Sequence, residues 1–280
     1  MPIDPDVAIG AEVGTLEFSW SSSDVLLYHL GIGAQDLRYT LETDPGFQVL
    51  PSFAVVAPTF HATEAPSLDL PGCDINLAQV VHGSQEVQVA SPLPPSGSAS
   101  LTTSIVDVWD KGKAAVIWQE GVATDPSGTE LWRVRSSIFV KGEGGWGGDR
   151  GESTSVPAPE RAPDASMTYD VRPEQALLYR LSGDRNPLHA DPEFAKLAGF
   201  PAPILHGLCT WGIVLREVTD TLLGGDATAV AGFKGRFTGV VFPGETLTVN
   251  AWDEPDGIAV AATVGDGDRP ALSDCLVTRR

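Results

Sequence analysis

The sequence is poor in cysteine and in basic residues, and it has no long apolar run. Its three cysteines, Cys73, Cys209 and Cys275, lie far apart without a CxxC pair. This pattern excludes a disulfide framework or a zinc knuckle and favours a reducing compartment. No apolar run approaches the ~18 residues that a membrane-spanning helix needs, and the N-terminal residues are acidic where a signal peptide is basic. We therefore expect a soluble cytoplasmic protein without a membrane partner.

Basic residues number 18 against 37 acidic ones, which gives a net charge of −19. Such a charge excludes a protein that is held to nucleic acid by its overall field. Of the 280 residues, 42% are hydrophobic, which is enough for one large core or two modest ones. At this length two domains are expected.

Residues 142–166 differ from the rest of the chain in being rich in glycine, proline, serine and charge. They contain a formal GxGxxG motif from Gly142 to Gly147, which is found in dinucleotide-binding loops. Such a loop needs a helix directly after the glycines, and here Pro157 and Pro159 follow instead. The segment is therefore interpreted as a linker between an N-terminal domain, residues 1–141, and a C-terminal domain, residues 167–280.

The two halves resemble each other in sequence. LLYHL at residues 26–30 matches LLYRL at residues 177–181, and two further matches, around Pro51 and Pro203 and around Pro95 and Pro243, follow in the same order. Three matches in one order indicate a duplicated unit of about 120–130 residues.

Each unit begins with helical segments and continues with strands. In the second unit an apolar helix is expected from Pro203 to about Leu223, where two glycines end it. Alternation and turn residues predict strands at residues 85–90, 99–110, 114–124 and 129–141 in the first unit and at 230–241, 246–253, 258–264 and 272–279 in the second. The predicted fold is α+β, with an antiparallel sheet wrapped around a long central helix in each unit. Placing the two sheets edge to edge would protect their edge strands.

The copies differ where chemistry is expected. The second copy has Asp184 and His189 where the first has Gly33 and Arg38. Pro187 keeps the loop between them out of a regular helix, so the carboxylate and the imidazole can be aimed at one point. Such a pair can act as general acid and base near neutral pH. The same composition is also typical of a plain turn.

Residues 179–212, YRLSGDRNPLHADPEFAKLAGFPAPILHGLCTWG, resemble the signature of the MaoC-like hydratases, and more narrowly the (R)-specific 2-enoyl-CoA hydratase 2 group. The resemblance implies a double hotdog fold with a degenerate N-terminal unit and an active C-terminal one. It also implies reversible hydration of trans-2-enoyl-CoA to (R)-3-hydroxyacyl-CoA in the β-oxidation of fatty acids or of a steroid side chain. The CoA thioester would be the substrate, and no separate cofactor is implied.

By the same resemblance, Asp184 and His189 would be the catalytic pair, and Asn186 would fix the loop or the water. The backbone N–H of Gly207 would bind the thioester oxygen. Which member of the pair is acid and which is base stays open. Two alternatives also stay open: a biosynthetic dehydratase, which would use the same pair, and a non-catalytic acyl-CoA-binding subunit. We expect a homodimer.

Binding of the polyanionic coenzyme calls for a local positive patch on this acidic protein. The candidate residues for CoA contact are Arg185, Lys234, Arg236, Phe237, His82 and Gly83. A solvated charge for the cations and a strand-entry turn for His82 and Gly83 are the alternatives.

The remaining candidate residues are given ordinary structural roles. His189, Asp191 and Glu193 have metal-ligand chemistry, but Asp191 fits better as the N-cap of a short helix, so no metal is expected. His206 and Cys209 are expected to be buried.

The first half is expected to accommodate the acyl chain. Its apolar stretch at residues 51–63 contains Pro58, which breaks a regular helix. This segment is predicted to open a pocket for long or bulky acyl groups.

Overall fold

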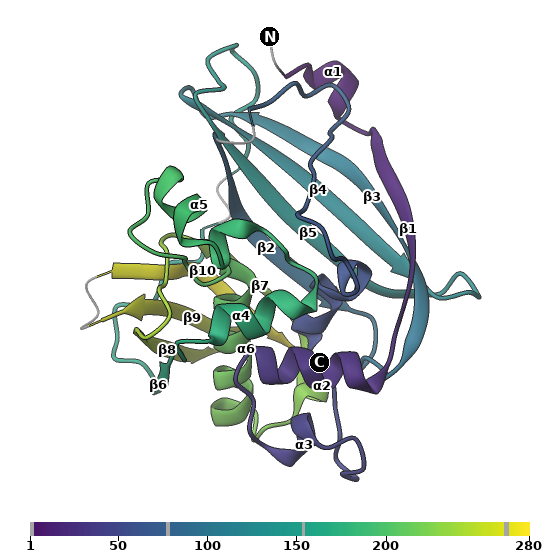
Figure 1. The fold of residues 1–280 in the computed structure, drawn as a ribbon, viewed down its shortest axis with the longest axis vertical. Helices are drawn as coiled ribbons and strands as arrows, with labels where there is room; N and C mark the ends of the chain where they lie inside the picture. The colour runs from purple at the N-terminus through teal and green to yellow at the C-terminus, as the bar shows by residue number, and fades with distance from the viewer. Residues whose placement is uncertain (1–2, 77–78, 153–154, 266–268) are drawn as a thin grey trace.

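The computed structural model describes residues 3–76, 79–152, 155–265 and 269–280. Its strands form one 10-stranded sheet with the order β1-β3-β4-β5-β2-β7-β10-β9-β8-β6, antiparallel throughout (Figure 1). The first half supplies β1 (Glu12–Trp20), β2 (Val80–Val89), β3 (Gly97–Asp110), β4 (Ala114–Thr124) and β5 (Glu130–Lys141). The second half supplies β6 (Ala165–Asp170), β7 (Val230–Phe237), β8 (Thr246–Glu254), β9 (Gly257–Val264) and β10 (Arg269–Arg279).

Short helices accompany this sheet, and only α6 is long. The α-helices are α1 (Pro5–Ala8), α2 (Ser22–Gly31), α3 (Leu37–Thr40), α4 (Gln175–Tyr179), α5 (Pro192–Leu197) and α6 (Gly207–Leu222). The 3₁₀ turns are η1 (Pro51–Val55), η2 (Ala57–Thr59), η4 (Arg180–Ser182), η5 (Pro187–His189) and η6 (Ala227–Ala229). Within the described ranges, no helix has both the length and the apolar character needed to cross a membrane.

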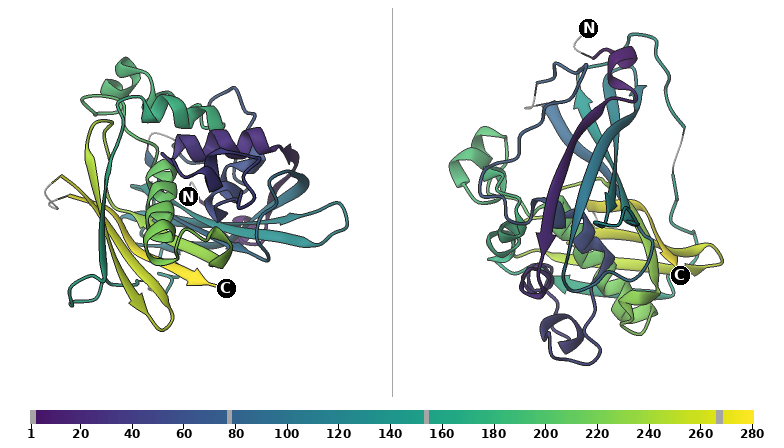
Figure 2. Two further views of the ribbon diagram at one scale, coloured as in Figure 1. Left: turned by 90° about the horizontal axis from the view of Figure 1, so that it is seen from below. Right: turned by 90° about the vertical axis from the view of Figure 1, so that its right-hand side faces the viewer.

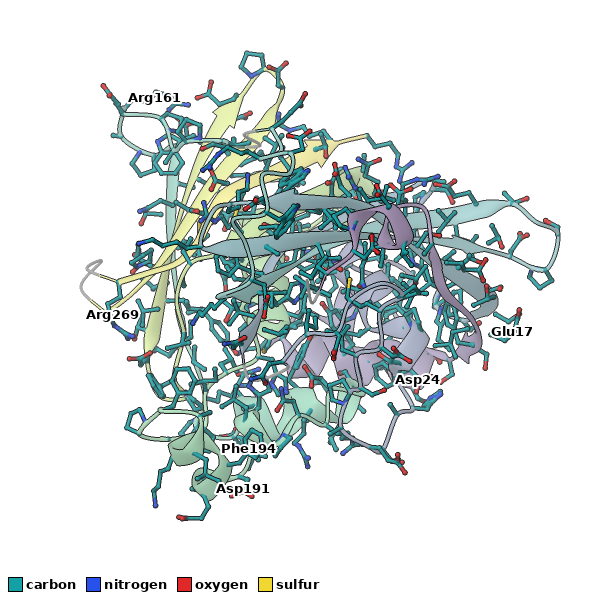
Figure 3. The ribbon with its side chains drawn as sticks, turned by 90° about the horizontal axis from the view of Figure 1, so that it is seen from above. Glu17, Asp24, Arg161, Asp191, Phe194 and Arg269 are labelled. Atoms are coloured by element: carbon teal, nitrogen blue, oxygen red, sulfur yellow. The ribbon has the colours of Figure 1, made fainter. Side chains whose placement is uncertain are left out.

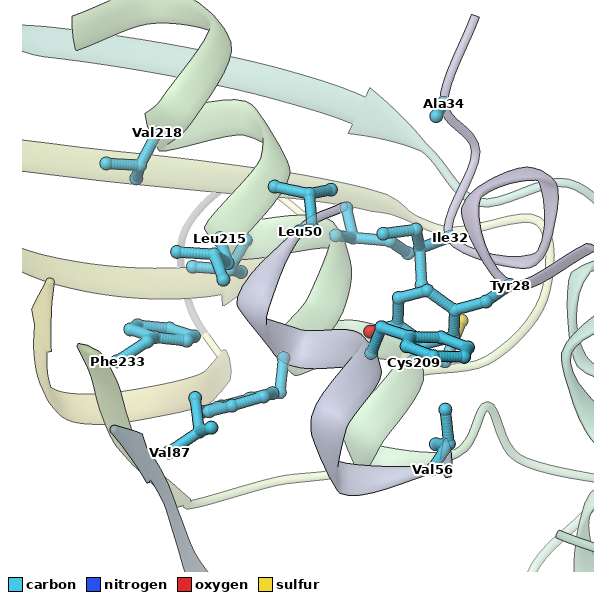
Figure 4. Packing of buried hydrophobic residues seen from close by; sticks show 14 of the residues in the cluster. Tyr28, Ile32, Ala34, Leu50, Val56, Val87, Cys209, Leu215, Val218 and Phe233 are labelled. Atoms are coloured by element: carbon cyan, nitrogen blue, oxygen red, sulfur yellow. The ribbon is translucent and has the colours of Figure 1, made fainter. Parts of the chain in front are cut away.

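The two halves meet edge to edge, as expected. Residues 84–88 of β2 pair with residues 232–236 of β7, so neither strand leaves an open edge at the centre of the sheet. On the helical side α2 lies against α4, and the rings of the matching residues Tyr28 and Tyr179 are 6.2 Å apart. Tyr28, Ile32 and Cys209 pack together at this contact (Figure 4).

The central segments of the two halves differ. In the second half α6 begins at Gly207 rather than at the expected Pro203, because the chain before it is extended and Leu205 donates to the Val241 carbonyl. It ends at Leu222, close to the predicted Leu223. The first half has no long central helix. Residues 51–55 and 57–59 form two 3₁₀ turns there, because Pro58 lacks the N–H group that a continuous α-helix needs at that position.

The strand predictions are correct for the interior of the sheet and incomplete elsewhere. β2 begins earlier than predicted, and β7 ends at Phe237 rather than at residue 241. The two edge strands β1 and β6 were not predicted. β6 begins inside residues 142–166, the predicted linker, of which residues 153–154 lie outside the described residues.

The linker runs on the face of the sheet away from α4 and α5 (Figure 2). Its glycine-rich part is fixed by the Asp110 carboxylate, which accepts N–H groups from Gly145, Gly147 and Gly148, and also from Gly112. These bonds, led by that of Gly145, lower the pKa of Asp110 to about 2. The GxGxxG-like segment therefore does cradle an anion, but the anion is the chain's own carboxylate.

Candidate active site

The loop between η4 and η5 carries the predicted acid and base. The Asp184 carboxylate accepts the N–H of Asn186 at 3.1 Å, and the Asn186 side chain accepts the N–H of Leu188 at 3.0 Å. Asn186 is thus the N-cap of η5, whose last residue is His189. Asp184 and Asn186 each accept the N–H of the residue two positions further on. These local hydrogen bonds hold the backbone that presents Asp184 and His189.

The N-terminal half supports this loop from the outside. Gly183 has φ of +102°, and a Cβ there would overlap the carbonyl oxygen of Thr59 in η2. Two residues further on, Arg185 donates its Nε to the Ala62 carbonyl at 3.1 Å. The first half therefore contributes backbone support to the loop of the second half.

His189 is buried and its tautomer is fixed. Its Nδ1 lies 2.9 Å from the Ile204 carbonyl, which can only accept, so Nδ1 carries the proton and Nε2 keeps its lone pair. Burial lowers the pKa of His189 below its ordinary value of 6.5, while the negative charge of Asp184 acts in the opposite direction. The ring is therefore neutral at pH 7 and has one nitrogen able to accept a proton.

His206 completes a three-residue cluster with the predicted pair. Ligand-type atoms of Asp184, His189 and His206 all lie within 4.8 Å of one another. The two imidazole rings are stacked, with centroids 3.8 Å apart and planes 29° apart. Nitrogen lone pairs lie in the ring plane, so nearly parallel rings cannot both point at one tetrahedral ion. This donor set therefore fits a metal poorly.

The other metal-type residues have structural roles. Asp191 accepts the N–H of Glu193 at 2.9 Å and caps α5, and Glu193 pairs with Lys196 at 2.7 Å. Figure 3 shows Asp191 and Phe194 together at the outer end of this helix.

Gly207 lies at the first turn of α6, next to the cluster. Within the described part of the chain no acceptor is paired with its N–H, as expected for the start of a helix. The residue is exposed, and a Cβ there would lie 3.1 Å from the ring of Phe237. A bare N–H at the positive end of a 16-residue helix suits a developing oxyanion.

The candidate CoA residues separate into three places. The rings of His82 and Phe237 are 4.7 Å apart beside Gly207. His82 is exposed, and its Nε2 lies 3.1 Å from the Ser84 carbonyl. Lys234 and Arg236 line a cavity of about 760 Å³ that lies partly beneath the linker.

Gly83 also lines this cavity, together with acidic or basic side chains from β2, β3, β5, β7, β10 and the linker. Arg236 lies 3.9 Å from Asp274 there. Arg185 is absent from the lining and contacts the first half instead. Lys234 and Arg236 thus share one surface, and Arg185 lies apart from them.

The equivalent position in the first half is closed. Gly33, which matches Asp184, has φ of +77°, and the hydroxyl of Tyr169 occupies the space where a Cβ would stand. Arg38, which matches His189, pairs with Asp36 at 2.8 Å and donates to the Gly225 carbonyl. The first half thus has neither the residues nor the space for a second pair.

Sequence reasoning missed two features of the site. The contact of Gly183 with η2 joins distant parts of the chain, so no local pattern announces it. His206 was assigned to the core, and it is buried, but its adjacency to Gly207 was the available signal that it borders the site.

Comparison with known proteins agrees with this geometry. Residues 18–142 match the MFE-2 hydratase 2 N-terminal domain, and residues 154–266 match the MaoC like domain. An enoyl-CoA hydratase of Mycobacterium tuberculosis is 56% identical, covering 94% of this chain and 93% of its own. A 3-hydroxyacyl-thioester dehydratase of the same organism is 44% identical, covering 94% of this chain and 92% of its own.

The same relationship holds in three dimensions. The crystal structure of a MaoC-like dehydratase from Phytophthora capsici superposes with a TM-score of 0.91 at 31% identity and covers 98% of both chains. The fold is accordingly a double hotdog. Family models in each half and relatives aligned over nearly the whole chain lead to one conclusion: the chain belongs to the MaoC-like hydratases of the hydratase 2 type.

Proposed function

We propose that this protein hydrates trans-2-enoyl-CoA reversibly to (R)-3-hydroxyacyl-CoA in the β-oxidation of acyl-CoA. One observation carries the proposal. A carboxylate at Asp184 and an imidazole with a free Nε2 at His189 lie together with His206, and the next residue, Gly207, has an N–H without an acceptor among the described residues. Addition of water to an enoyl thioester needs a base for the water, a proton for Cα and a donor for the thioester oxygen.

In the proposed mechanism the thioester oxygen accepts the Gly207 N–H, which makes Cβ electrophilic. Nε2 of His189 removes a proton from water as its oxygen bonds to Cβ, and the electron pair of the C=C bond moves to form the enolate. The imidazolium then returns the proton to Cα, so one water is added and the ring is regenerated. Asp184 orients the water and stabilises the transient imidazolium.

For the coenzyme, we propose that His82 and Phe237 flank the pantetheine arm beside Gly207. Lys234 and Arg236, with Gly83 at the rim, would lie near the phosphates. They share a cavity on the face of β7 opposite to Phe237, so the coenzyme would pass around the end of that strand. Arg185 would act on the loop that it ties to Ala62.

For the acyl chain, we propose that the N-terminal unit, residues 1–141, provides the space through its segment 51–63, and that residues 142–166 connect it to the catalytic unit, residues 167–280. The 3₁₀ turns of that segment leave apolar Phe53 and Phe60 buried close to the catalytic loop. Fatty and steroid-type chains are both candidates for this space.

Asp184 and His189 would also catalyse the reverse reaction, dehydration. One relative is named as a 3-hydroxyacyl-thioester dehydratase, so dehydration is an alternative physiological direction. A substrate screen separates these possibilities. We expect hydration of enoyl-CoA esters to a 3-hydroxyacyl-CoA of R configuration by chiral analysis, with carrier-protein thioesters much slower. Binding of acyl-CoA without turnover would leave only a non-catalytic role.

We further propose a homodimer in a reducing cytoplasm. The side chains of Leu30, Leu177 and Leu181 are exposed on the neighbouring helices α2, α4 and η4 and offer an apolar contact surface. Free Cys73, Cys209 and Cys275 suit such a compartment. Sedimentation of the wild-type protein and of a Leu177→Ser variant tests the dimer, and a wild-type monomer would contradict it.

A further inference from the structure

The His206 side chain contacts two parts of the site, the backbone of the Asp184 loop and the ring of His189. Its Nε2 lies 3.3 Å from the backbone carbonyl of Asp184, and its ring stacks on His189. It is also the N-cap residue of α6, directly before the Gly207 N–H. One buried side chain thus joins the carboxylate loop to the imidazole, and its own backbone leads into the helix start.

The burial of His206 excludes it as a second base for water. A carbonyl oxygen only accepts, so Nε2 carries the proton. Its Nδ1 is buried and, within the described chain, has no hydrogen-bond partner. Burial, together with the adjacent His189, lowers the pKa of His206 to about 2. The ring therefore stays neutral over the working range of the enzyme.

The stack on His189 has a chemical consequence. A flat neutral ring at 3.8 Å occupies one face of the His189 imidazole and excludes water from it. In the described part of the chain, four other charged or titratable groups lie near the two stacked histidines: Asp184 on the loop, Tyr179 on α4, Arg180 on η4 and His82 on β2. None of these is stacked on the His189 ring among the described residues.

We propose that His206 is a positioning residue for the reaction, resting on the proposed function: its hydrogen bond sets the place of the Asp184 loop, and its stack sets the orientation and dryness of His189. These two contacts use different parts of the ring. They can therefore be removed one at a time.

Two substitutions separate the contacts. His206→Phe keeps a flat ring but removes the donor to the Asp184 carbonyl. We expect kcat to fall about 10- to 100-fold, as for an ångström-scale displacement of a reacting group, with the acid limb of the pH profile unchanged. His206→Gln keeps an N–H donor but removes the stack. Water then reaches His189, its pKa rises towards the ordinary value, and the acid limb of kcat/KM moves to higher pH.

The matched control is His29→Gln, because His29 is equally buried and bonds the backbone of Tyr39 and Leu50 away from the catalytic loop. It should lower stability without changing the pH profile per folded enzyme. Folded His206 variants with wild-type kcat and pH profile would overturn the inference. Absence of hydration by the wild-type protein would instead overturn the proposed function.

If the His206 variants fail to fold, a measurement on the wild-type protein still tests the proposal. Nitrogen-15 NMR of the imidazoles should show His206 as the neutral Nε2–H tautomer and His189 as the Nδ1–H tautomer. A His206 ring that carries its proton on Nδ1, or that titrates together with the acid limb of activity, would contradict the proposal.

Discussion

At the scale of single residues, the catalytic pair is the first point to test. We expect Asp184→Asn and His189→Ala to lower kcat by at least ~100-fold, the usual contribution of a general acid or base, with circular dichroism unchanged. Crotonyl-CoA hydration measures the effect. Near wild-type turnover in a folded variant would remove that residue from the mechanism.

Gly183 tests how the loop is supported. Alanine is strained at φ of +102°, and its Cβ would overlap the Thr59 carbonyl, so Gly183→Ala must displace the loop or η2. We expect loss of kcat by about 100-fold. Gly199→Ala is the control, because Gly199 also has positive φ (+86°) but nothing within 4 Å. It should cost only about 1–2 kcal/mol of stability, and similar activity losses in both would contradict the support role.

His29 makes stability depend on pH. Burial lowers its pKa from 6.5 to about 4, so the unfolded chain binds the proton more tightly than the folded one. The free energy of unfolding should therefore be unaffected above pH 6.5 and fall by about 3 kcal/mol on acidification to pH 4. Urea titrations across this range, compared with His29→Gln, measure the difference. An equal slope in both proteins would exclude His29 as the cause.

The sequence was informative about these residues where the duplicated halves could be compared. Asp184 and His189 stood out because Gly33 and Arg38 occupy their places in the first copy. Gly183 and His206 could not be recognised in the same way. Their roles depend on Thr59 and on a ring stack, which are contacts between segments distant in the chain.

At the scale of elements, strands with a buried face are predicted from the sequence more accurately than exposed strands. Interior strands such as β8 alternate between buried and half-buried residues, and the bounds of β8 are predicted to within one residue. The edge strand β1 is mostly exposed and lacks that pattern. The central segment of the first half was recognised as broken at Pro58, but its replacement by 3₁₀ turns depends on packing against β2 and α6.

That segment carries the prediction on chain length. Phe53 and Phe60 are almost fully buried in it, so Phe53→Trp and Phe60→Trp should fill the space proposed for the acyl group. We expect kcat/KM for long-chain or steroid-type enoyl-CoA to fall about tenfold, with crotonyl-CoA affected little. Equal effects on short and long substrates would place the acyl chain elsewhere.

At the scale of the whole molecule, the linker is bound as well as covalently connected. Removing the carboxylate in Asp110→Ala frees the N–H groups of its glycines. Limited proteolysis should then cut residues 142–152 faster than in the wild type. Asp125→Ala, which removes a carboxylate that caps a local turn, is the control and should leave this cleavage unchanged. Equal linker cleavage in wild type and Asp110→Ala would show that the glycines need no anion.

The closure of the Gly33 position by Tyr169 has a consequence for stoichiometry. Two identical hotdog units would form two equivalent sites, whereas the described residues of this chain offer one candidate site, built from two unequal halves. Calorimetric titration with a tight-binding acyl-CoA analogue should therefore saturate at one equivalent per chain. Gly33→Asp alone should not raise that number, because a tyrosine ring already fills the space. The duplicated chain thus has one site for two hotdog units. The N-terminal unit, which carries no catalytic pair, can change its sequence to fit different acyl chains.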